Sequence, residues 1–495
     1  MKEQFMDKSI DVNEILKKAA ALYDEKKFSE AVELWKSIED VGCAEALYRL
    51  GICYNYNRGV DVQDEEKRGV IASGYFMKAG EMGHADAQCF VGLCYRCGLG
   101  VDKDLKKSVE WFEKSAAQNC AQAMNNLGLM YEQQEVDLEL NESDKEYEEY
   151  VGEYDDFEED EEDGDDENGE SGDVRRKKCA KSMRISFEWY MKSAQLKNAT
   201  GQLSVGRAYY HGRGVPCDYK AAVKYYSLAA EQGSADAFFR LGECYDGGEG
   251  VEQNAIKAFQ YYREAAKRNH AKAQCYVGYC YEYGEGVKRN FDEALKWYNV
   301  SAENKYGQAY CNLGCMYEEG RGVKKNMSKA IEMYERGFEH GNYMSAYNLG
   351  NVYAFGKGVK VNMELALKYY AEAAQGGVAE AQYNLAQHLH NGKYIEQDDE
   401  AAAYWFMQSA RNGDADAQYK IGSFFMNGVG VDEDPELGFY WFLKSAMQGD
   451  GDAQYAVGLC YEEGMGVEVD LDEALEWYAR SAKQGNKEAK KRLKG

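Results

Sequence analysis

Small, apolar and aromatic residues recur along this chain at a fixed interval. In segments such as FVGLCY, RLGECY and AVGLCY, an apolar residue precedes a glycine, and an aromatic residue follows that glycine three positions later. We call the small central residue the marker of a repeat. The markers are Gly51, Gly92, Gly128, Gly206, Gly242, Gly278, Gly314, Gly350, Ala386, Gly422 and Gly458. From Gly206 onward, each marker lies 36 residues after the one before it.

Each interval predicts two helices joined by a short loop. An alanine usually lies five residues before the marker, so the alanine, the marker and the aromatic residue share one face of a helix. A glycine-rich loop such as GEGV or GRGV follows. A second segment then carries an aromatic pair, such as Trp297 and Tyr298, and ends in SA or AA. The pattern therefore predicts an all-α chain of repeated helix–turn–helix units.

The glycine inside the first helix is best explained by packing. Glycine costs about 1 kcal/mol relative to alanine in a helix interior, and ten of the eleven markers are glycine. We expect close approach of a neighbouring helix, with large aromatic side chains in the next layer, to compensate for this cost. A unit of two helices cannot bury its apolar side alone, so the units are expected to stack on one another.

The full pattern, A-x4-G-x2-Y-x2-G-x-G-V followed by A-x2-W-Y-x3-A, resembles the Sel1-like repeat (SLR) family, a relative of the tetratricopeptide repeat. The resemblance covers residues 40–485. It implies an α-solenoid, a right-handed superhelix of about eleven 36-residue repeats, that acts as a non-enzymatic adaptor in protein complexes. Residues 1–40 look like a tetratricopeptide-like capping hairpin, and residues 486–495 look like a basic C-terminal capping helix.

One interval is longer than the others. Gly206 lies 78 residues after Gly128, which is 42 more than the regular step. The sequence therefore predicts an insert, residues 137–180, between the two helices of the third repeat, whose second helix is expected to begin at Ser182. Repeats are predicted in residues 41–136 before the insert and in residues 181–485 after it.

The insert is strongly acidic. Between Glu135 and Asp173 there are 22 acidic residues and one lysine, in a chain whose formal net charge is −27. Such a segment has too few aliphatic residues to form a core and is expected to be disordered. Two hypotheses follow for this acidic arm. It captures a basic partner, or it shields the rest of the chain from wrong partners.

Outside this arm the charge is nearly balanced, with 58 basic and 64 acidic residues, so no basic field favours nucleic acid. The N-terminus lacks the apolar core of a secretory signal, and no run of eighteen apolar residues predicts a membrane span. The 14 cysteines are then expected to be free thiols in a reducing compartment, the cytoplasm. The nucleus, suggested by the basic run 175–178, and the ER lumen, suggested by four Asn-x-Ser/Thr sequons, are alternatives.

Three motifs that suggest chemistry are better explained by the repeat. Cys89, Cys94 and Cys97, with Cys120 beyond, have the spacing of an iron–sulfur site, yet other repeats carry cysteine at the positions of Cys89 and Cys94. The GEGV loops lack the preceding strand and the Lys-Ser/Thr ending of a phosphate loop. The two histidines of QHLHNGK are two residues apart and point to different sides of a helix. We therefore predict no catalytic residue, no metal site and no cofactor.

The resemblance places the first helices of the repeats on the concave side of the solenoid, where related repeats hold extended peptides with polar side chains. Side-chain amides donate and accept hydrogen bonds at once, which suits a peptide backbone. The predicted partner-binding residues, two before or one after a marker, are Asn126, Arg240, Asn312, Asn348, Asn351, Asn384, Gln387 and Lys420. Acidic residues four after the marker, such as Glu282 and Glu318, favour a protein or peptide partner that is neutral or basic.

Alternatives to this partner-binding prediction stay open. Asparagine at these positions is also an ordinary polar residue for an exposed helix. The resemblance further leaves room for an enzyme, a hydrolase of β-lactam or cell-wall substrates as in some secreted relatives. A regulatory activator of a membrane-bound enzyme is a third function that the resemblance allows.

Overall fold

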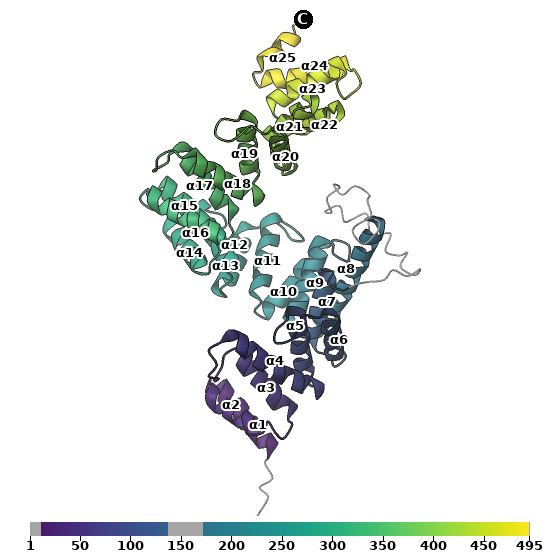
Figure 1. Ribbon diagram of the computed structural model, residues 1–495, viewed down its shortest axis with the longest axis vertical. Helices are drawn as coiled ribbons and strands as arrows, with labels where there is room; N and C mark the ends of the chain where they lie inside the picture. The colour runs from purple at the N-terminus through teal and green to yellow at the C-terminus, as the bar shows by residue number, and fades with distance from the viewer. Residues whose placement is uncertain (1–10, 137–171, 495) are drawn as a thin grey trace, which may run out of the picture. The chain divides into compact units, whose positions relative to one another are not determined.

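The computed structural model describes residues 11–136 and 172–494, and over these residues all regular structure is helical (Figure 1). The chain divides into two units, Met1–Arg268 and Asn269–Gly495. Each unit is described by itself below. The predicted all-α class is confirmed.

The first unit consists of helix pairs in chain order. Its helices are α1 (Val12–Asp24), α2 (Phe28–Lys36), α3 (Ala44–Asn55), α4 (Glu65–Glu81), α5 (Ala85–Cys97), α6 (Leu105–Ala116), α7 (Ala121–Glu132), α8 (Gly172–Gln195), α9 (Ala199–His211), α10 (Tyr219–Glu231), α11 (Ala235–Gly247) and α12 (Ala255–Lys267). The predicted N-terminal hairpin corresponds to α1 and α2, whose buried side chains share a core with Leu50 and Cys53 of α3.

The second unit repeats the same hairpin. Its helices are α13 (Ala271–Tyr283), α14 (Phe291–Glu303), α15 (Gly307–Glu319), α16 (Met327–Glu339), α17 (Tyr343–Phe355), α18 (Met363–Gln375), α19 (Ala379–Asn391), α20 (Asp399–Arg411), α21 (Ala415–Asn427), α22 (Pro435–Met447), α23 (Gly451–Glu463), α24 (Leu471–Lys483) and α25 (Lys487–Arg492). In both units each helix packs against the next one along the chain, which is the arrangement of an α-solenoid. The short α25 buries Ala489 against Ala474 and Tyr478 of α24.

The marker glycines lie directly beneath an aromatic ring of their own hairpin. A Cβ atom added to Gly206 would lie 2.5 Å from two ring carbons of Tyr226, which is 20 residues further along. Each of the other nine marker glycines meets the phenylalanine or tyrosine at the same repeat position. These rings are almost fully buried, for example Tyr226 and Tyr262. The predicted close approach is therefore confirmed, and the neighbouring helix is the second helix of the same repeat.

The glycines of the loops have a different role. The first loop glycine ends the first helix in the left-handed conformation, as Gly248 does with a φ of 77°. The second, such as Gly250 with a φ of 71°, lies so close to the backbone carbonyl of Tyr219 in the preceding repeat that a Cβ atom would clash. Both positions favour glycine, because a side chain there meets a positive φ or a neighbouring backbone, although Asn57 and Gln134 adopt a positive φ at the first position.

Helices α7 and α8 form one hairpin although 39 residues separate Glu132 from Gly172 in the chain. In α8, the Ser193 hydroxyl donates to the Ala121 carbonyl at the start of α7, over 2.7 Å and across 72 residues. The same bond joins residues 30 apart in other repeats, as from Ser301 to Ala271. This hydrogen bond therefore spans 42 more residues in the third repeat than in the other repeats.

Helix α8 begins ten residues before the start that the sequence predicts. Its first turns hold the basic run 175–178, which carries no apolar periodicity. Further along, Cys179 and Ala180 are buried, and the Ser182 hydroxyl donates to the Tyr131 carbonyl over 2.6 Å. Contacts with α7 thus extend the helix toward the N-terminus, and the predicted insert boundary at residue 180 is too late. Residues 137–171 of the predicted insert lie outside the described residues.

Candidate partner-binding face

Six of the predicted partner-binding residues lie in the second unit, on the first helices of successive repeats. They are half-buried, and each lies two before or one after a marker: Asn312, Asn348, Asn351, Asn384, Gln387 and Lys420. On α17, Asn348 and Asn351 are three residues apart and so share one face of the helix. The other two lie in the first unit, Asn126 on α7 and Arg240 on α11.

Three of these amides hydrogen-bond to a thiol of the preceding repeat. The Asn312 amide nitrogen lies 3.5 Å from the Cys275 sulfur, and the Asn348 nitrogen lies 3.5 Å from the Cys311 sulfur. In the first unit, the buried Asn126 amide is 3.6 Å from the Cys89 sulfur. Each thiol lies three before its own marker. These asparagines therefore hold neighbouring repeats together, through sulfur, a weak acceptor.

The remaining predicted residues have local partners or none. The Asn351 carbonyl oxygen accepts from the Tyr370 hydroxyl over 2.8 Å, and the Gln387 amide donates to the Tyr383 hydroxyl over 2.6 Å. Arg240 forms an ion pair of 2.7 Å with Glu243 on its own helix. Asn384 and Lys420 make no hydrogen bond or ion pair within the described part of the chain, so their polar groups are open to a ligand.

The acidic residues four after the marker link adjacent repeats. Glu282 is 4% exposed, accepts from the Tyr298 hydroxyl over 2.6 Å and pairs with Arg321 of the next repeat at 2.5 Å. Glu318 accepts from Tyr334 over 2.8 Å and pairs with Lys357 at 2.7 Å. Their oxygens are thus engaged within the chain, and the sequence argument that used them to favour a basic partner was wrong in its choice of residues.

The ion pair between adjacent repeats recurs at the same two repeat positions, with the acidic and basic residues exchanged in one case. Residue four after one marker meets residue seven after the next marker. Glu132 pairs with Arg213 at 2.9 Å, and Arg96 pairs with Glu135 at 2.7 Å, with the signs reversed. The sequence contains a sign of this link, because opposite charges stand 39 residues apart in successive repeats, but without a structure nothing distinguishes them from other charge pairs.

The cysteines do not form the clusters that their spacing suggests. All 14 are free thiols, and Cys97 is exposed while Cys89 and Cys94 are buried. Across residues 11–136 and 172–494, no three His, Cys, Asp or Glu side chains converge as a metal site would require. His390 instead lies 2.6 Å from the Asp399 carboxylate through its Nδ1 atom, and burial lowers the pKa of His388.

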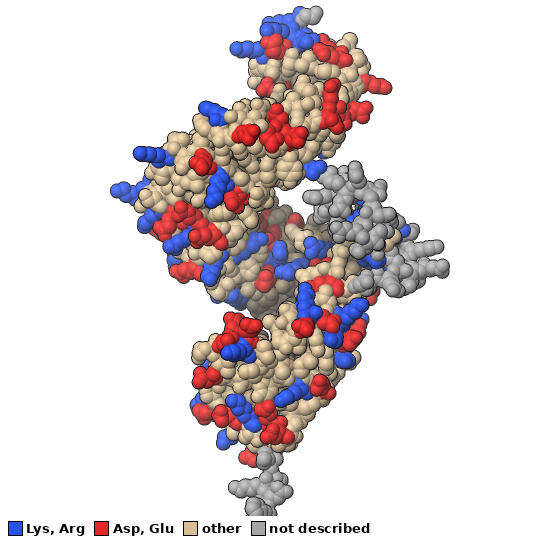
Figure 2. Space-filling model, in the orientation of Figure 1, with Lys and Arg blue, Asp and Glu red and all other residues tan. Residues whose placement is uncertain are grey.

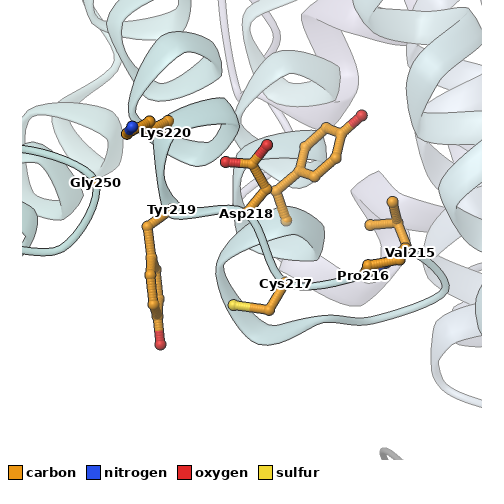
Figure 3. Close-up of a pocket in the computed structure, with 8 residues that line it drawn as sticks. Val215, Pro216, Cys217, Asp218, Tyr219, Lys220 and Gly250 are labelled. Carbon is orange, nitrogen blue, oxygen red and sulfur yellow. The ribbon is translucent and has the colours of Figure 1, made fainter.

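Shallow pockets occur at the loops that join the two helices of a repeat. The pocket of Figure 3, about 550 Å³, is lined by Tyr209, the loop 215–218, the start of α10 and Gly250. Asp218, Tyr219 and Lys220 point in three different directions, so their polar atoms do not converge (Figure 3). Pockets at the same repeat position occur beside Gly430 and beside Gly100. Since the pocket recurs with the loop, it is a feature of the repeat.

No helix in the described part of the chain is both long and apolar enough to cross a membrane.

Comparison with known proteins identifies the repeat. A family model described as Sel1 repeat matches residues 44–84, 85–120, 121–141, 199–234, 235–270, 271–306, 307–342, 344–378, 379–414, 415–450 and 451–486. A comparison with curated proteins gave no match.

Solved structures include similar proteins. One is a protective antigen with an SLR fold from uropathogenic Escherichia coli, at 30% identity over 93% of this chain and 89% of that one, with a TM-score of 0.49. Another is a Sel1 repeat protein from Oxalobacter formigenes, at 32% identity over 50% of this chain and 99% of that one, with a TM-score of 0.45. Both TM-scores are below 0.5, so the assignment rests on the eleven matched repeats and on sequence identity. The chain belongs to the Sel1 repeat family.

Proposed function

We propose that this chain is a non-enzymatic scaffold that binds a protein partner, through an extended peptide segment, on the face formed by first helices of the second unit. Chains built from Sel1 repeats are generally protein-interaction modules and typically not enzymes. The observation that carries the proposal is the row of half-buried polar side chains on α15, α17, α19 and α21, where Asn384 and Lys420 have no partner in the described residues.

The row matches the chemistry of a peptide backbone. An amide offers two N–H donors and a carbonyl acceptor, so a single asparagine pairs with both backbone groups of one peptide residue. Asn348 donates one N–H to Cys311 and keeps its second N–H for a ligand. Asn384 keeps both N–H donors and its carbonyl acceptor for a ligand. Because these side chains belong to a packed helix, less ordering entropy is lost on binding than from a mobile loop.

Two further parts of the proposal come from the sequence. The acidic arm between Glu135 and Asp173, with 22 acidic residues and one lysine, modulates which partners reach the scaffold by attracting basic ones. The partners are cytoplasmic, where exposed thiols such as Cys97 and Cys217 stay reduced. The proposal assigns no residue a catalytic role and needs no cofactor.

A comparison of two double variants tests the proposal. The first, Asn384→Ala/Gln387→Ala, removes both amides from the face of α19. The matched control, Asn299→Ala/Gln375→Ala, removes two amides from the second helices α14 and α18. Affinity capture with mass spectrometry should recover the partners with the wild type and with the control but not with the first variant. Equal recovery by all three proteins, each with an unchanged melting temperature, would exclude this face as the site.

A further inference from the structure

The negative charge of the chain is concentrated in a second region besides the acidic arm. Residues 379–470 contain 17 acidic and four basic residues, all within the second unit. The rest of the chain, without the arm, contains 54 basic and 47 acidic residues. Figure 2 shows acidic side chains gathered over the part of the molecule that carries α19–α24, with few basic ones between them. This region therefore differs from the repeats before it.

Three tyrosines stand at the same repeat position in this region. Tyr383, Tyr419 and Tyr455 lie three residues before the markers of α19, α21 and α23, and all are half-buried. Each ring packs on the aromatic residue of its own second helix, with ring centroids 5.6, 5.4 and 5.6 Å apart. Such packing fixes the orientation of the rings and leaves part of each one exposed.

Tyr383 and Tyr419 each lie beside the acidic first turn of the next first helix, whereas the helix that follows Tyr455 and its hairpin is the basic α25. Burial and then the negative charge of Asp416 raise the pKa of Tyr383. Burial and then Asp452 and Asp450 raise the pKa of Tyr419. The carboxylates of Asp416 and Asp452 are exposed, as is that of Glu380 on α19. Aromatic rings and carboxylates therefore alternate from α19 to α23.

These carboxylates lack a basic partner. Within the described residues, Glu380, Asp414, Asp416 and Asp450 form no ion pair. The pKa of Asp414 is raised by burial and, to a smaller extent, by the charges of Asp416 and Glu380. A cation placed among them gains Coulomb energy from several carboxylates at once.

The fold does not require acidic residues at this position. In α19, α21 and α23 the residue six before the marker is Glu380, Asp416 and Asp452, and an acid in the first turn favours a helix. Helices α13, α15 and α17 have no acidic residue in the first turn and still have the same length of 13 residues. Within the second unit this position is acidic only in α19, α21 and α23, and in the first unit Glu45, Asp86 and Asp236 occupy it.

We propose that Tyr383, Tyr419 and Tyr455, with Glu380, Asp416 and Asp452, form a docking strip for an extended segment of a partner protein rich in lysine and arginine. A cation over an aromatic face and a charge-assisted hydrogen bond to a carboxylate are both available to such side chains. Packed helices lie about 10 Å apart, and an extended peptide advances about 3.3 Å per residue. A partner peptide with a basic residue at every third position would therefore place one basic side chain at each repeat. The inference rests on the proposed function and specifies its ligand.

Selection from a random 12-residue peptide library on the full chain tests the strip. The strip variant is Glu380→Gln/Asp416→Asn/Asp452→Asn, which leaves every N-cap residue in place. The matched control is Asp432→Asn/Glu433→Gln/Glu436→Gln, which removes the same charge from exposed residues near the start of α22. Wild type and control should select peptides enriched in lysine and arginine, and the strip variant should lose this enrichment. A selected basic peptide should bind the strip variant at least tenfold more weakly at low salt.

Other outcomes separate this inference from the proposed function. Selection of neutral peptides whose binding is lost with Asn384→Ala would overturn the strip and keep the scaffold. Basic enrichment that survives in the strip variant would also overturn it, and would point to the acidic arm as the basic-binding element. If no peptide is selected by the wild type, both proposals fail. Equal melting temperatures of the three proteins show that the comparison concerns binding.

Discussion

The Arg321 guanidinium of one repeat lies 2.5 Å from the carboxylate of Glu282 in the repeat before it, and Glu282 is nearly fully buried. The Tyr298 hydroxyl completes the arrangement with a hydrogen bond of 2.6 Å to the second carboxylate oxygen. A charge that is shielded from water in this way depends on its partner, because burial without compensation is costly. The pair therefore works as a link between repeats.

Removing the Arg321 guanidinium should lower the free energy of unfolding by more than is usual for a partly exposed residue. Arg321→Ala leaves the carboxylate of Glu282 buried and unpaired, and should destabilise the second unit by about 3 kcal/mol, a value typical of broken buried pairs. Lys357→Ala breaks the more exposed pair with Glu318 and should cost about 1 kcal/mol. Urea unfolding of both variants checks the order. Equal shifts of the unfolding midpoint would show that Glu282 does not depend on Arg321.

A marker glycine and a glycine outside the marker positions should respond to alanine substitution with opposite changes in stability. Gly242→Ala would place a Cβ atom 2.5 Å from the Tyr262 ring, and the overpacking should destabilise the chain by about 2 kcal/mol despite the helix preference for alanine. Gly74 lies in the middle of α4 with no neighbouring atom within 4 Å of its Cβ position. Gly74→Ala should therefore stabilise by about 1 kcal/mol. Thermal unfolding measures both, and a stabilising Gly242→Ala would disprove the packing role.

Glu45 on α3 should make stability depend on acidic pH. The hydrogen bonds from His84, at 2.9 Å, and Arg49, at 2.7 Å, lower the pKa of Glu45 to about 2 from its ordinary 4.5. A depressed pKa in the folded state stabilises above pH 4.5, and this contribution is lost as the pH falls toward 2. Because the side chain is 42% exposed, solvent screening reduces its worth to about 1 kcal/mol.

The variant Glu45→Gln isolates this effect. Its free energy of unfolding should be about 1 kcal/mol below that of the wild type at pH 6, and the two should converge near pH 2. Glu66→Gln, at an exposed glutamate that forms no ion pair in the described residues, is the control with no pH-dependent difference. A constant difference between wild type and Glu45→Gln from pH 6 to pH 2 would contradict the prediction.

Cys120 should be an unusually acidic thiol. It is the N-cap residue of α7, without a side-chain capping hydrogen bond, and the hydrogen bond with the Cys89 thiol is the main cause that lowers the pKa of Cys120 to about 6. Alkylation by iodoacetamide at Cys120, followed by peptide mass spectrometry, should show half-maximal rate near pH 6. Cys89→Ala should move this midpoint upward by more than one pH unit, since the hydrogen-bond donor is lost. A midpoint above pH 8 in the wild type would contradict the assignment.

The interval between markers, by itself, determined the repeat. It predicted the two helices of each hairpin, the turns and the close approach of a helix at each marker glycine, because these depend on residues within one 36-residue unit. That the glycine lies directly beneath an aromatic ring came from the structure. The interruption after the third marker also followed from counting. The start of α8 did not, since the helix extends back to Gly172 and buries Cys179 and Ala180, which have no counterpart in the repeat pattern.

The contacts between repeats were decided only by the tertiary structure. Asn312 looked like a ligand-binding amide in the sequence, but stacking brings it to the Cys275 thiol 37 residues earlier. Glu282 was interpreted from the sequence as favouring a neutral or basic partner, but stacking buries it against Arg321. The same stacking sets Asp416 beside Tyr383 of the preceding repeat. Hairpin structure depends on neighbours a few residues away, whereas these contacts depend on how one hairpin lies on the next, which periodicity alone does not specify.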